Sequence, residues 1–226
     1  MLNTWVRIGK SPLRITLILG AVLGLNAVLY IAQAPAARPT VSTAQIPPLA
    51  VGDWVFRAGT SAESRLIQTL SDSEFSHIGM IVSLQPEPLI AHATTDDDPQ
   101  RPNQVLTSTL SDFITPQLAR SFAIARPSFM NKDDHQYTAA QVLKQLHQPF
   151  ILAERSTEHL YCTTLLADAL HHATRPFQPQ WQQINAPLLS GEYLFPRAFA
   201  DYPGIEWVYR STDTPSTTPK NTHNTQ

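Results

Sequence analysis

The chain of 226 residues contains one cysteine, Cys162, which follows Tyr161 at the start of an apolar, helix-like segment. A cysteine at the beginning of a helix lies at the positive end of the macrodipole, near unpaired backbone N–H groups that favour thiolate over thiol. The amide of Cys162 could also stabilise the oxyanion of a tetrahedral intermediate. This placement predicts a nucleophilic cysteine with a lowered pKa. The alternative use of an unpaired cysteine is a buried inert thiol or an intermolecular disulfide.

A nucleophilic thiol needs a base, and two of the eight histidines lie in strand-like segments. His77 belongs to the segment 76–84 and shares its face with Gly79, whose small size would leave room for a substrate. His92 belongs to the next strand-like segment, 88–93. If the two strands pair antiparallel, His92 can hydrogen-bond the second ring nitrogen of His77 and fix its tautomer. The spacing therefore predicts His77 as the base and His92 as the third catalytic residue.

Two further groups of polar residues carry weaker chemical patterns. The acidic run 96–98 follows the strand of His92; it favours a solvated turn, because it lacks the alternating ligands of a calcium loop. This run is the alternative source of the third catalytic residue. His159, Cys162 and the pair 171–172 could be zinc ligands, but adjacent helical histidines point about 100° apart and no second cysteine is present. Neither a metal nor a cofactor is expected.

The segments that hold these residues mix strand and helix patterns. Strand patterns are found at 52–57, 76–84, 88–93 and 122–126, and helix patterns at 60–70, 133–146 and 161–172. Thr60 and Glu63 have the spacing of a capping box for the first helix. With 19 prolines against 8 glycines, the mixture predicts a loop-rich α+β domain. A net charge of -2 without a basic stripe argues against nucleic acid as a partner.

The pattern of the N-terminal sequence predicts an export signal. Three basic residues precede an apolar run, 15–34, and no acidic residue occurs before Asp53. A run of about 20 residues is long enough to span a bilayer, and cleavage after Ala34 would leave Pro35 as a poor first residue. A retained membrane anchor is therefore favoured over a cleaved signal peptide. The positive flank stays in the cytoplasm, so the remaining chain is expected outside it, and in the periplasm if the signal is cleaved.

Composition divides the rest of the chain. Residues 35–48 are rich in proline, alanine, serine and threonine and predict a linker, whereas the domain is expected over 49–210. Residues 211–226 contain no large apolar side chain and predict a disordered tail.

Four segments together resemble the YiiX/YebB-like group of NlpC-type cysteine hydrolases, over about residues 52–210. The segments are GDWVFR, SRLIQTLSDSEFSHIGMIV, PLIAHA and YCTTLLADAL. Their most specific parts are the Ser-His-x-Gly strand of Ser76, His77 and Gly79 and the helix start at Tyr161 and Cys162. Proteins of this group are circularly permuted relatives of papain in which the histidine strand precedes the cysteine helix, an order shared by lecithin:retinol acyltransferase-like proteins.

The resemblance implies a small antiparallel sheet packed on helices and an amide hydrolase that works through an acyl-enzyme. Cys162 would be the nucleophile, His77 the base and His92 the third polar residue. The group pattern usually has glutamate where this chain has His92, and serine where it has Thr163. A cell-wall peptide or related amide is the expected substrate, and the alternatives are a lipid acyl substrate or a non-catalytic binding module.

Overall fold

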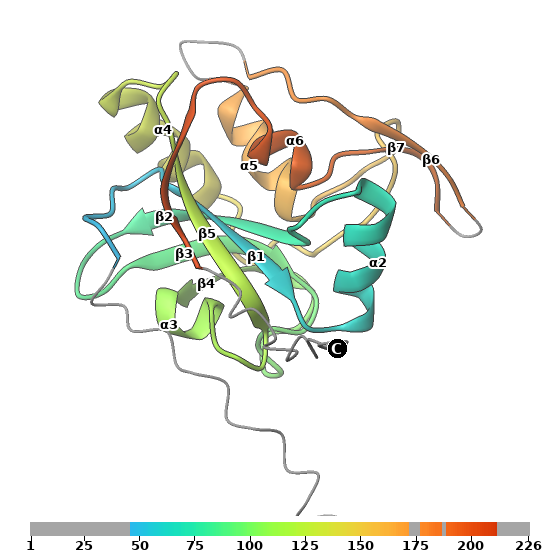
Figure 1. Ribbon diagram of the computed structural model, residues 1–226, viewed down its shortest axis with the longest axis horizontal. Coiled ribbons are helices and arrows are strands. Elements are labelled where there is room, and N and C mark those ends of the chain that lie inside the picture. Colours follow the sequence, from blue (N-terminus) through green and yellow to red (C-terminus); the bar gives the residue numbers. More distant parts are fainter. Residues whose placement is uncertain (1–45, 172–176, 187–188, 212–226) are drawn as a thin grey trace, which may run out of the picture. The chain divides into compact units, whose positions relative to one another are not determined.

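The computed structural model describes residues 46–171, 177–186 and 189–211 (Figure 1). The predicted signal or anchor, nearly all of the predicted linker and all but Ser211 of the predicted tail lie outside these residues. Within the described ranges, no helix is both long enough and apolar enough to cross a membrane.

The centre of the domain is a six-stranded antiparallel sheet with the strand order β4-β3-β2-β1-β5-β8. Its strands are β1 (Trp54–Gly59), β2 (His77–Ser83), β3 (Leu89–Thr94), β4 (Gln104–Thr109), β5 (Ala119–Pro127) and β8 (Ile205–Arg210). A separate hairpin is formed by β6 (Gln182–Ala186) and β7 (Leu189–Tyr193). The helices are α2 (Ala62–Ser71), α3 (Leu110–Phe113), α4 (Lys132–Leu143), α5 (Cys162–Leu170) and α6 (Arg197–Ala200). The expected α+β class with an antiparallel sheet packed on helices is confirmed.

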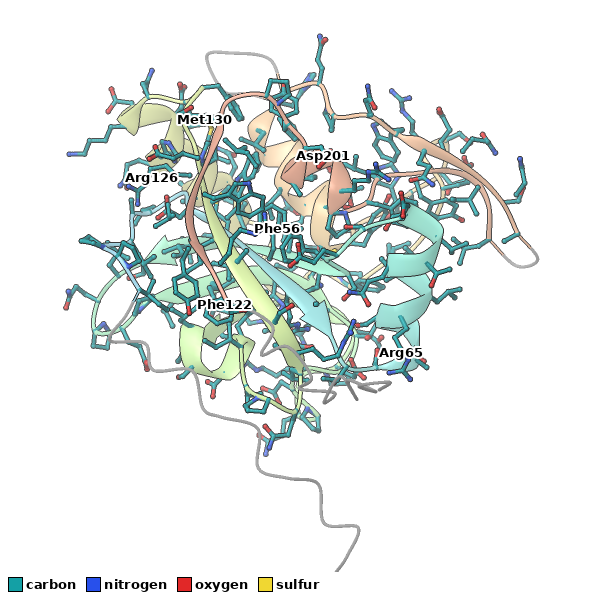
Figure 2. The ribbon with its side chains drawn as sticks, in the orientation of Figure 1. Phe56, Arg65, Phe122, Arg126, Met130 and Asp201 are labelled. Carbon is teal, nitrogen blue, oxygen red and sulfur yellow. The ribbon has the colours of Figure 1, made fainter. Side chains whose placement is uncertain are left out.

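Both faces of the sheet are covered, so its central strands β1, β2, β3 and β5 are buried on both sides. In Figure 1, α4, α5 and α6 lie above the sheet and α3 lies below it. The alternation of side chains along β1 divides the core: Phe56 packs in the cluster shared with α5, and Val55 in the cluster shared with α3. Figure 2 shows Phe56 in the upper layer and Phe122 in the lower one.

All seven predicted elements are present, with ends shifted by a few residues. The capping box predicted from Thr60 and Glu63 is wrong, because Ser61 is the N-cap of α2 and its hydroxyl accepts from the amide of Ser64. The alternating pattern did not single out β4, whose sequence QVLTST mixes small polar and apolar residues on both faces. The aromatic segment expected to pack on the core does so partly as an edge strand, β8.

Gly79 allows β2 and β3 to approach closely. The register Met80↔Ala91 extends to place His92 opposite Gly79. A Cβ atom at position 79 would lie 2.5 Å from Cγ2 of Ile90 and 3.2 Å from Cβ of His92. The space beside Gly79 is therefore filled by β3, and the expectation that it leaves room for a substrate is wrong.

Gly79→Ala should destabilise the domain, because a buried, β-branched side chain and the backbone of β3 would have to move. We expect a loss of about 1–3 kcal/mol in the free energy of unfolding, measured by urea denaturation. Glu87→Ala, in the exposed turn between the same strands, is the matched control and should change stability little. Equal stability of the Gly79→Ala and wild-type proteins would contradict the close approach.

Candidate active site

Cys162 is the first residue of α5, and its two neighbours attach the start of this helix to one residue beyond the hairpin. The hydroxyl of Tyr161 accepts from the amide of Leu194 at 2.9 Å, and the hydroxyl of Thr163 donates to the carbonyl of Leu194 at 2.7 Å. The amide of Tyr161 donates to the hydroxyl of Thr164, which caps the helix. The position of the thiol is therefore set by hydrogen bonds on both sides of it. Threonine supplies the needed hydroxyl at position 163.

The thiol of Cys162 is largely buried, with 9% of the residue exposed. Burial raises its pKa to about 11, although backbone N–H groups of Ile78, Thr163 and Cys162 itself act to lower it. The helix start thus acts in the expected direction, but desolvation outweighs it. The prediction of a lowered pKa is wrong for the resting protein, whose cysteine is a neutral thiol.

His77 and His92 form a hydrogen-bonded pair across β2 and β3. Nε2 of His77 lies 3.0 Å from Nδ1 of His92. The expectation that antiparallel pairing would join the two imidazoles is confirmed. Because Nε2 of His77 is occupied by this bond, Nδ1 is the ring nitrogen left to accept a proton.

The second nitrogen of His92 is also hydrogen-bonded. Nε2 lies 2.9 Å from the hydroxyl oxygen of Ser108, on β4. His92 is fully buried, so both of its ring nitrogens are satisfied inside the protein.

An ion pair adjoins the histidines on the same face of the sheet. Arg57, which is the register partner of His77 on β1, donates to both carboxylate oxygens of Asp97 at 2.8 and 2.9 Å. These two side chains are only 7% and 5% exposed. Arg57 also donates to the carbonyl of Phe113 and lies over its ring at 4.7 Å. One oxygen of Asp97 comes within 3.8 Å of Nδ1 of His92.

Burial keeps both histidines neutral, and the neighbouring charges act on their pKa values in opposite directions. Burial, followed by the positive charge of Arg57, lowers the pKa of His77 well below 6.5, whereas Asp97 acts to raise it. Burial lowers the pKa of His92 to about 3, again against Asp97. Although burial acts to raise the pKa of Asp97, its bonds to Arg57 hold it well below the usual range. The resting site therefore combines a neutral thiol with two neutral imidazoles, which lie beside the bidentate Arg57–Asp97 ion pair.

Cys162 and His77 approach the start of β2 from different layers. Cys162 belongs to the cluster under α5, whereas His77 stacks on Phe113 of α3, with ring centroids 5.5 Å apart. They meet at the backbone, since the sulfur accepts from the amide of Ile78, the residue next to His77. No thiol–imidazole hydrogen bond is formed among the residues that the structure describes. A small shift on substrate binding would be needed to form it.

The prediction of a solvated turn for the acidic run is confirmed for Asp96, which is exposed, and is wrong for Asp97. Asp97 is buried in the ion pair with Arg57, whereas Asp98 pairs with Arg101 nearer the surface, with side chains 30% and 42% exposed. Asp97 thus lies beside His92 without replacing it in the hydrogen bond to His77. Of the alternative zinc ligands, His159 faces the carbonyl of Thr157, and position 172 lies outside the described residues.

Two cavities open away from these side chains. The larger, of about 1000 Å³, lies between the end of α2, the start of β6 and α6, and its lining includes Trp181 and Arg197. The smaller, of about 360 Å³, lies between α4 and α5 beside His159. Neither is lined by Cys162 or His77.

Residues 48–215 match the family model Peptidase_C92, permuted papain-like amidase enzymes of the YaeF/YiiX, C92 family. The chain belongs to this family. The protein is thus, at the family level, an amide hydrolase with a permuted papain-like fold. A crystal structure described as metalloprotein yiiX from Escherichia coli O157:H7, DUF1105, shares the fold with a TM-score of 0.60 and 19% identity. The match covers 71% of this chain and 97% of that chain. No curated protein matches the chain.

In this permuted papain-like amidase, sequence patterns missed Arg57 and Ser108 as parts of the site. Arg57 could have been found, because it shares a strand face with Val55 and a buried arginine requires an anionic partner. Ser108 carried no such signal. Its strand was not predicted, and its contact with His92 depends on the register of β3 with β4.

Alkylation of Cys162 in the full-length amidase should depend on pH as expected for a buried neutral thiol. Its raised pKa leaves little thiolate near neutrality, so the rate with iodoacetamide should rise about tenfold per pH unit from pH 6 toward pH 10. Because the chain has no other cysteine, Cys162→Ala should remove all labelling. A rapid rate with a plateau below pH 7 would instead demonstrate a resting thiolate–imidazolium pair.

Proposed function

We propose that this protein is an exported cysteine amidase that cleaves an amide bond through an acyl-enzyme on Cys162. The proposal is supported chiefly by one arrangement: the only cysteine begins a helix, and its sulfur meets the amide next to His77, which is hydrogen-bonded to His92. A thiol nucleophile, a base and a group that orients the base are the parts that such a reaction requires.

The hydrogen bonds assign the proton transfers. Nδ1 of His77 takes the thiol proton as the sulfur attacks the carbonyl carbon of the substrate. The C–N bond then breaks, and the amine leaves with the proton from His77. Water next attacks the thioester, losing a proton to His77, and the carboxylic acid and free thiol are released. Because burial favours the neutral forms of Cys162 and His77 at rest, the thiol proton is transferred only after substrate has bound.

Two features would stabilise charge during this reaction. The first-turn amides of α5 already point toward the sulfur and are suited to the oxyanion of the tetrahedral intermediate. Asp97 acts to raise the pKa of His77 and therefore favours the imidazolium that forms. Arg57 limits this effect by holding the carboxylate in a bidentate pair.

A metal-dependent hydrolase is a second candidate, because single ligand atoms of His77, His92 and Asp97 lie within 4.8 Å of one another. As the structure places them, these three side chains are poorly suited to bind a cation. The two imidazole nitrogens bond each other at 3.0 Å, and both oxygens of Asp97 accept from Arg57. A cation here would have to break both interactions and lie beside a guanidinium group. We therefore assign no step to a metal.

The substrate and location follow from the N-terminal sequence and are also part of the proposal. The apolar run 15–34 after basic residues favours a membrane anchor, with the domain outside the cytoplasm, or a periplasmic protein if the signal is cleaved. A cell-wall peptide or related amide is accessible there. A lipid amide or ester is the alternative, because an anchored domain would lie near the bilayer.

Cys162→Ser should reduce turnover by at least about a thousandfold, because a hydroxyl is far harder to deprotonate than a thiol. Mass spectrometry of the wild-type protein, quenched during turnover, should show an acyl group on Cys162, and its mass separates peptide from lipid substrates. His159→Gln, a change at a histidine outside the proposed triad, is the control and should retain activity. Activity that survives Cys162→Ser but is lost to a chelator would contradict the thiol mechanism.

The full chain should remain with the membrane fraction after a wash with 1 M salt (about 3 Å Debye length), because hydrophobic insertion is not screened as surface charge contacts are. Detergent should release it. Sequencing the N-terminus of the exported protein provides the control for cleavage. A soluble form beginning near Ala36 would show a cleaved signal in place of an anchor.

A further inference from the structure

We propose that Ser108 is a positioning residue that, by partnering Nε2 of His92, maintains the tautomers of His92 and His77 that the reaction requires. This inference rests on the proposed role of His77 as the base. It adds a fourth member to the chain of side chains behind Cys162.

The geometry of the chain is continuous over three neighbouring strands. Nε2 of His77 on β2 lies 3.0 Å from Nδ1 of His92 on β3, and Nε2 of His92 lies 2.9 Å from Oγ of Ser108 on β4. The pairing of Ile90 with Ser108 and of His92 with Leu106 fixes this diagonal contact. The ring of His92 also packs edge-on against Phe113, with centroids 5.0 Å apart, which limits its rotation.

A buried neutral His92 carries one ring proton, so the chain has two possible arrangements. In the first, His92 donates from Nε2 to Ser108 and accepts at Nδ1 from His77. This leaves Nδ1 of His77 with a free lone pair. In the second, His92 donates from Nδ1 to His77 and accepts at Nε2 from Ser108. Neutral His77 then carries its proton on Nδ1.

Only the first arrangement makes His77 a base toward Cys162. In the second arrangement, the ring nitrogen that must accept the thiol proton already holds one. The tautomer of His92 thus decides whether the neutral base is competent before any substrate binds.

Ser108 affects this choice because a hydroxyl can either accept or donate. It satisfies Nε2 of His92 in both arrangements, so the productive one incurs no penalty. Without the hydroxyl, the first arrangement would leave a buried N–H donor without a partner, whereas the second would leave only a bare lone pair. Unpaired buried N–H groups are the rarer and more costly of the two in proteins.

The charged groups around His92 make this contact more important. Asp97, which follows β3, lies 3.8 Å from Nδ1 and attracts a proton to that nitrogen, which is the unproductive position. Arg57 from β1 and Arg101 oppose a positive charge on His92, and His77 faces it from β2. Ser108 is the partner that permits the proton to remain on Nε2.

The test compares Ser108→Ala, Ser108→Thr and wild-type full-length protein. Long-range ¹H–¹⁵N correlation spectra of the resting protein assign the proton of His92. We expect Nε2–H in the wild-type and Ser108→Thr proteins and a shift toward Nδ1–H in Ser108→Ala. The kcat of Ser108→Ala should fall about tenfold to a hundredfold with little change in KM, since the defect lies in the base. Ser108→Thr should recover most of this loss.

Ser111→Ala is the matched control, because it removes an exposed hydroxyl three residues away and should alter neither measurement. If Ser108→Ala does not fold, Ser108→Cys, which keeps a similar volume with a weak acceptor, should show the same tautomer shift. An unchanged His92 tautomer in the variant that folds would overturn the proposal. An inactive Cys162→Ser protein in the same series would then show that the thiol mechanism stands without it. Retained activity of Cys162→Ser would instead show that the proposed function itself fails.

Discussion

The hydrogen bond between His77 and His92 is the interaction on which the remaining site depends. It requires two buried imidazoles on neighbouring strands to approach within 3.0 Å, and it forms beside Gly79, where any side chain would displace β3. The bond occupies Nε2 of His77 and so leaves Nδ1 as the ring nitrogen that can accept a proton. It also makes the state of His77 dependent on whatever contacts the far side of His92. The glycine of the Ser-His-x-Gly pattern thus permits the close packing of β3 on β2 and does not leave a substrate space.

Burial determines the electrostatic character of the site. The same desolvation that raises the pKa of Cys162 lowers those of His77 and His92, so all three are uncharged at rest. Arg57 and Asp97, beside the histidines, carry full charges that neutralise each other in a bidentate pair.

The thiol of Cys162 is held in place by a separate set of hydrogen bonds. Tyr161 and Thr163 bind the amide and carbonyl of Leu194, so the start of α5 is attached to the segment that follows the hairpin. Because α5 packs on β2, this attachment also fixes the position of the thiol next to the backbone amide of Ile78. A change in the hairpin region could therefore alter the thiol position without touching the histidines.

Much of this was predictable from local patterns. The alternation in 76–84 and 88–93 identified two strands with histidines on defined faces, and the apolar periodicity after Tyr161 placed Cys162 at a helix start. These are properties of neighbouring residues, so the sequence alone determined them. The pairing of Arg57 with Asp97, the contact of Ser108 with His92 and the neutral state of the thiol were decided only by the tertiary structure. Each depends on strand register and on the removal of water by distant segments, and neither quantity is encoded in the spacing of any single segment.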